Sequence, residues 1–150
     1  MKSKAPLALM EQLVMLLVFA LAAALCVQAF SAADSLSRQG ERRDRAALLA
    51  QNTAEMLKEY GAQIDAAELA DELGGAAEDG ARVRVYLDGT LTQTQPTPTE
   101  DTEYLLQVEL MEPSCGGRLG RAEIAVYPAD GEEPLFSIPA AWQEDENADA

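Results

Sequence analysis

Carboxylates are the most abundant groups in this chain that could do chemistry. The 150 residues include 26 Asp and Glu but no His. A carboxylate pair can hydrolyse a glycosidic bond, yet no spacing marks one pair among so many acids. The absence of histidine removes the commonest general base and a favoured zinc ligand. Cys115, the one nucleophile candidate, has no histidine to activate it. We therefore expect no enzyme and no cofactor.

Calcium binding is the other chemistry that acidic side chains suggest. Asp145, Asn147 and Asp149 have the spacing that opens a calcium loop, but the Gly and the distal Glu of such a loop do not follow. Aspartate also occurs in loops because it favours turns. We expect no metal site, although a calcium ion held by loop acids stays open as an alternative for four residues: Asp79, Asp88, Asp101 and Asp130.

The charges are divided unevenly along the chain. Residues 1–45 carry six basic and four acidic residues, whereas residues 46–150 carry five basic and 22 acidic residues, a net charge of −17. Nucleic-acid affinity depends on Lys and Arg contacts to phosphates. The sequence therefore predicts no nucleic-acid partner, and no small-molecule substrate is evident.

Residues 12–33 contain no charged side chain. These 22 residues form a helix of about 33 Å, enough to cross a hydrocarbon core of about 30 Å. A cleavable signal peptide is the alternative, with Lys2 and Lys4 at its start and Val27-Gln28-Ala29 at its cleavage site. The apolar stretch exceeds the usual 7–15 residues of a signal peptide, and Glu11 interrupts the approach to it. We favour a retained transmembrane helix.

The flanking charges do not settle the orientation of this helix. Lys and Arg occur on both sides of it, and the positive-inside rule counts those residues alone. A long domain behind a short leader is normally left outside. We expect a single-pass protein of the cell membrane with an extracytoplasmic C-terminal domain.

The periodicity predicts that the helix continues from about Met10 to Tyr60. Good helix formers dominate this region, and one apolar stripe follows the membrane segment: Ala46, Leu49, Ala50, Thr53, Leu57, Tyr60 and Ile64. A second, short helix is predicted at residues 65–73.

Strand patterns occupy the rest of the chain. Residues 82–87 alternate polar and apolar, and Asp88-Gly89 predicts a hairpin to residues 90–95. Residues 103–111 and 121–127 are expected to pair, and residues 135–138 to form an edge strand that Pro139 ends. The predicted fold class is α+β, a long N-terminal helix packed on a small antiparallel sheet. The expected segments are residues 1–11, a basic leader; 12–33, the membrane helix; 34–61, its amphipathic continuation; 62–143, the domain; and 144–150, a disordered acidic tail.

The first 30 residues, MKSKAPLALMEQLVMLLVFALAAALCVQAF, resemble the N-terminus of type IV pilin-like proteins, including the pseudopilins of type II secretion and competence systems. Family members have a short basic leader and a glutamate at the fifth position after the cut made by prepilin peptidase. The resemblance implies that Glu11 is this glutamate and that the cut falls between Pro6 and Leu7. The family usually has Gly or Ala where Pro6 stands, and Phe or Met where Leu7 stands.

The resemblance implies an assembly role for Glu11. A carboxylate in hydrocarbon costs roughly 2.5–3.5 kcal/mol on insertion scales, so it needs a partner. In the family that partner is the free N-terminal amine of a neighbouring subunit. An interfacial position beside Lys4 is the simpler alternative for Glu11.

A mixed-charge segment, residues 37–45, follows the membrane helix. Its arginines could meet anionic headgroups, or they could pair with acidic faces of neighbouring subunits. The whole sequence suggests a minor, pseudopilin-like subunit that assembles with other pilin-like subunits or secretion machinery. A membrane-anchored extracytoplasmic binding domain without a filament is the alternative.

Overall fold

The structure, a computed structural model, describes residues 5–60, 64–92, 94–114, 116 and 118–143. The expectations for Lys2, Lys4, Cys115 and the acidic tail therefore lie outside the described residues. The chain divides into two units, Met1–Glu41 and Arg42–Ala150.

Helix α1 runs from Ala5 to Glu59. The prediction of one long helix is confirmed, and its start lies five residues before the expected Met10. Pro6 is compatible with this start because proline is tolerated in a first helical turn, where its missing N–H has no helical partner. Gly40 lies within this helix although glycine has a low helix propensity.

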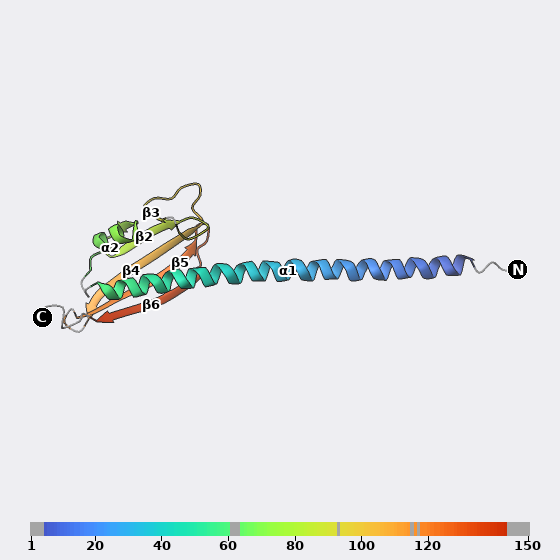
Figure 1. Cartoon of the computed structure of the whole chain (residues 1–150), viewed down its shortest axis with the longest axis horizontal. Coiled ribbons are helices and arrows are strands. Elements are labelled where there is room, and N and C mark those ends of the chain that lie inside the picture. Colours follow the sequence, from blue (N-terminus) through green and yellow to red (C-terminus); the bar gives the residue numbers. More distant parts are fainter. Residues whose placement is uncertain (1–4, 61–63, 93, 115, 117, 144–150) are drawn as a thin grey trace. The chain divides into compact units, whose positions relative to one another are not determined.

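The C-terminal part of α1 packs on the sheet (Figure 1) through the predicted stripe. Ala46, Ala50 and Leu57 are completely buried, and Ala54, which the prediction omitted, is 7% exposed. Thr53 is buried at 3% exposure, and its Oγ1 donates a hydrogen bond to the Leu49 carbonyl at 2.9 Å. The three alanines follow one another at spacings of four residues, so they lie on one face of the helix and belong to the same core cluster as the inner face of the sheet.

Helix α2, Ala66–Leu73, confirms the predicted short helix and is capped at both ends. The Asp65 carboxylate accepts a hydrogen bond from the backbone N–H of Glu68 at 2.7 Å, an N-cap. Gly74 ends the helix with a φ of 67°, and the Gly75 N–H donates to the Ala70 carbonyl at 2.8 Å. This is the left-handed C-terminal turn that glycine favours.

The sheet is antiparallel, with strand order β1-β2-β4-β5-β6, and β3 pairs with β2. Its inner face, toward α1, carries buried side chains that alternate along the strands, among them Val83, Val85, Leu106, Val108 and Ile124. This confirms the α+β fold of a long helix on an antiparallel sheet. The strands are β1 Ala76–Glu78, β2 Arg82–Leu87, β3 Thr94–Gln95, β4 Tyr104–Ser114, β5 Leu119–Pro128 and β6 Phe136–Gln143.

Two strand predictions need correction. The expected end of the last strand at Pro139 is wrong, because β6 continues to Gln143. β6 is an edge strand, so the N–H groups on its outer side have no partner strand in the described part of the chain. Proline, which has no N–H, can occupy such a position without loss of a hydrogen bond in the sheet. The hairpin return at residues 90–95 is limited to Thr94–Gln95. Asp88 accepts hydrogen bonds from Thr90 Oγ1 and from the Thr92 N–H, which makes the turn wider than two residues.

Substitution of Leu57 tests the packing of α1 on the sheet. Leu57→Ala removes a completely buried side chain, and we expect it to lower the free energy of unfolding of the folded unit by about 2–5 kcal/mol. The matched control is Leu48→Ala, on the same helix but 59% exposed, which should change the value by less than about 0.5 kcal/mol. Urea denaturation of the full chain in detergent measures both. Equal effects would contradict the packing described.

Tyr60 provides a spectroscopic probe of the junction between α1 and α2. Partial burial raises the pKa of its hydroxyl above the ordinary 10.0, and the Glu72 carboxylate adds to this by charge and by a hydrogen bond. Folding therefore favours the neutral phenol, and this contribution to stability is present below pH 10 and is lost as the pH rises through the folded pKa. In an absorbance titration, Tyr60→Phe should remove a tyrosine whose pKa lies above 10.0. Glu72→Gln should lower that pKa, whereas Glu55→Gln should not.

Candidate membrane anchor and binding surfaces

Large apolar side chains are exposed throughout the first half of α1. From Leu7 to Phe30 they are between 53% and 83% exposed, with Val14 at the lower limit and Phe30 at the upper. They occupy every face of the helix, because Leu13–Val27 is apolar at each position. Burial of one Leu, Val, Phe or Met side chain contributes about 1.5–3 kcal/mol. This segment therefore has a strong tendency to leave water.

One helix in the described part of the chain is long and apolar enough to cross a membrane, and it lies near the N-terminus. None of its most apolar stretch is buried within the protein. A buried core helix would have the same composition but would be covered by the fold. The span is therefore compatible with a single-pass anchor.

The predicted assembly and processing residues lie together at the start of α1. Pro6 and Leu7 are in its first turn, and Leu7 is 78% exposed. Glu11 follows Leu7 by four residues, so the two lie on the same face of the helix. The Glu11 side chain is exposed and forms no ion pair within the described residues.

The mixed-charge segment after the apolar stretch includes short-range ion pairs. Arg38 Nε lies 3.0 Å from Asp34 Oδ2, one turn away along the helix. Glu41 and Arg45 also have interaction partners. Arg42 and Arg43 are exposed. Such exposed pairs contribute little to stability. The exposed side chains of Arg42 and Arg43 can meet a membrane surface or another protein.

The acidic loop residues are not gathered into one site. Asp88 and Asp101 line the same small depression, Asp130 lines a different pocket with Arg42, and Asp79 lies in the turn between β1 and β2. Among the described residues there is no group of three or more side chains that could hold a metal ion.

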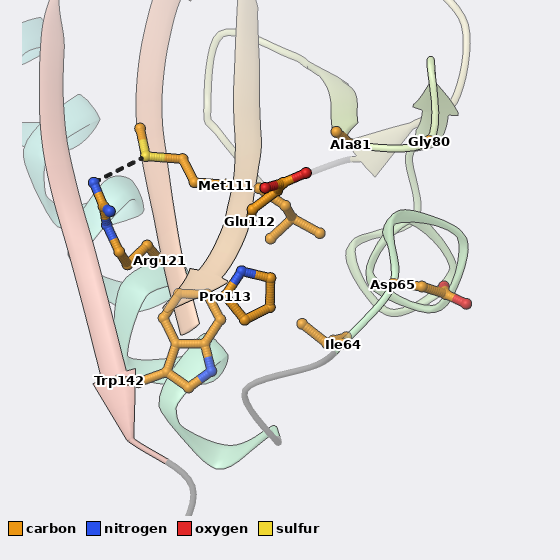
Figure 2. Close-up of a pocket in the computed structure, with 10 residues that line it drawn as sticks. Ile64, Asp65, Gly80, Ala81, Met111, Glu112, Pro113, Arg121 and Trp142 are labelled. Carbon is orange, nitrogen blue, oxygen red and sulfur yellow. Dashed lines mark hydrogen bonds between the residues drawn. The ribbon is translucent and has the colours of Figure 1, made fainter. Parts of the chain in front are cut away.

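A cavity of about 520 Å³ lies around the irregular end of β4. The register between β4 and β5 shifts between Met111 and Ser114, so Pro113 stands outside the regular ladder. Figure 2 shows Ile64, Pro113 and Trp142 around this cavity, with Arg121 and Met111 at one side. Arg121 Nη2 donates a hydrogen bond to Met111 Sδ at 3.7 Å. Sequence reasoning missed this cavity, because it ended the strand at residue 111, whereas β4 continues to Ser114 and includes Pro113.

No protein-family model, curated protein or solved structure matches this chain.

Proposed function

We propose that this chain is a membrane-anchored, pilin-like structural subunit, of the minor pseudopilin type, which assembles through its N-terminal helix. The observation that carries the proposal is the apolar half of α1, exposed on every face and directly preceded by Glu11. Its partners are membrane lipid and other pilin-like subunits or secretion machinery of a type II secretion, competence or type IV pilus-like system, and the domain from residue 42 onward is extracytoplasmic.

The continuity of α1 supports an assembly role as well as anchoring. An anchor needs only about 20 apolar residues, whereas α1 has 55 residues and provides both the apolar segment and the inner helix of the folded unit. The same helix therefore contributes residues both to the proposed anchor and to the core of the folded unit.

Glu11 supplies the specificity in this proposal. Within the described part of the chain it has no ion-pair partner, and burial of an unpaired carboxylate in lipid is costly. A cut between Pro6 and Leu7 creates a new α-amine on Leu7. The amine of one copy can pair with Glu11 of the next and fix their axial register.

The cavity around Trp142 favours a second candidate function, a membrane-anchored binding domain that forms no filament. Its volume, about 520 Å³, lies within the range of small-molecule sites. Its lining is mainly apolar, and its charged residues are Asp65, Glu112 and Arg121. In this alternative the helix serves only as an anchor, and Glu11 has no partner subunit.

Charge insertion tests the membrane anchor. Arg at the centre of a membrane helix costs about 2.5–3.5 kcal/mol, so we expect Leu17→Arg/Leu21→Arg to move the full chain from the carbonate-resistant membrane fraction to the supernatant. The control, Leu48→Arg/Asn52→Arg, places the same charges at the same spacing on exposed positions of the folded unit and should remain membrane-bound. If both pairs stay in the membrane fraction, residues 12–33 are not the anchor.

Replacement of Glu11 tests assembly separately from anchoring. We expect Glu11→Ala to reduce recovery of pilin-like subunits with a C-terminally tagged chain at least five-fold, because the axial ion pair is lost. The amount of tagged chain in the membrane should not change. Asp44→Ala, an exposed acid on the same helix, is the control. If Glu11→Ala recovers as many pilin-like subunits as the unchanged protein, Glu11 has no role in assembly. The membrane-anchored binding domain would then be the better proposal.

A further inference from the structure

The face of the sheet opposite α1, the outer face, differs in charge from the rest of the domain. Three arginines and three glutamates on the strands point to this face, and the net charge of these six residues is zero. Residues 46–150 otherwise contain 19 acidic and two basic residues. The strand register places the six in adjacent rows of one face: Arg82, Arg84 and Arg121, with Glu78, Glu109 and Glu123.

The charges of the outer face are only partly paired within the chain. Arg82 Nη2 lies 3.4 Å from Glu109 Oε1, and Arg84 Nη1 lies 3.2 Å from Glu78 Oε1. Each ion pair uses one Nη atom of a guanidinium that has five donors. The Nε atoms of both arginines are buried, so they are not available to another molecule. Neither Arg121 nor Glu123 forms an ion pair within the described residues. The face therefore has both positive and negative groups to offer.

The outer face also has apolar and aromatic surface. Tyr86, Leu105 and Tyr127 form one row across β2, β4 and β5, all partly exposed and outside the buried core. Met111 on β4 is 37% exposed, the only exposed large apolar side chain among the described residues beyond α1. Tyr, Met and Arg are the residue types enriched at protein interfaces.

We propose that the outer face is a docking surface for a second copy of this chain. Elsewhere two copies repel each other, because acids greatly outnumber bases on both. The outer face is the exception, since its three positive and three negative groups can face the same set on a second copy and match in charge. The tyrosines and Met111 supply the apolar contact area. This contact is distinct from the proposed assembly through Glu11 and does not require it.

A cross-link across the outer face tests the contact in the full-length, membrane-bound protein. Gln107→Cys, introduced with Cys26→Ser and Cys115→Ser, places one thiol at the middle of the face. A short bis-maleimide should give a dimer of this chain, identified by mass spectrometry. The matched control is Gln51→Cys on the exposed side of α1, which should give at least five-fold less dimer. Equal yields, or a product that contains a different protein, would overturn the proposal.

Charge complementation tests the reason for the contact. Arg121→Glu gives the face a net charge of −2, and Glu123→Arg gives it +2, so either variant alone should lose at least five-fold in dimer yield. Co-expression of the two, with different tags, should restore a mixed dimer. Arg118→Glu, in the turn between β4 and β5, changes the net charge equally and should keep the dimer. Failure of the mixed pair to recover, or loss with Arg118→Glu, would contradict a charge-matched contact. Carbonate extraction and the Glu11→Ala recovery assay remain independent readouts of the proposed function.

Discussion

The apolar half of α1 constrains everything else in this molecule, because it carries large exposed apolar side chains that the folded domain does not cover. Each such side chain gains about 1.5–3 kcal/mol on leaving water, and more than a dozen of them lie between Leu7 and Phe30. The total far exceeds the 5–15 kcal/mol by which a typical domain is stable. A surrounding of lipid or of other helices is therefore a physical requirement of this segment.

The same helix meets a different requirement in its second half. There the apolar residues occupy one face of the helix, and Ala46, Ala50 and Leu57 are buried against the sheet. The polar sides of this part remain exposed, as expected of a helix with one face in water. One element thus joins a segment that needs an apolar environment to a domain with 22 acids and five bases in residues 46–150. This combination supports the structural subunit that we propose. Because acids greatly outnumber bases in the rest of residues 46–150, the outer face of the sheet, with three arginines and three glutamates, differs from its surroundings.

The spacing of apolar residues predicted the helices and strands that depend only on residues close together in the sequence. The long helix, the stripe, the short helix α2 and the alternation in β2 could be predicted from the sequence. The extension of β6 past Pro139 could not, because it depends on an edge position that only the complete sheet defines. The cavity around Trp142 likewise depends on a register shift between β4 and β5. Glu11, Pro6 and Leu7 could be named from the sequence, but their roles depend on partners outside the chain.

The first residue of the mature protein, determined by mass spectrometry of the chain extracted from its native membrane, tests the central claim most directly. A retained anchor processed for assembly predicts a chain that begins at Leu7, with the apolar segment intact and Glu11 at its fifth position. An intact Met1 would keep the anchor but move the function to the anchored binding domain. A chain that begins near Phe30, released from the membrane, would contradict the account.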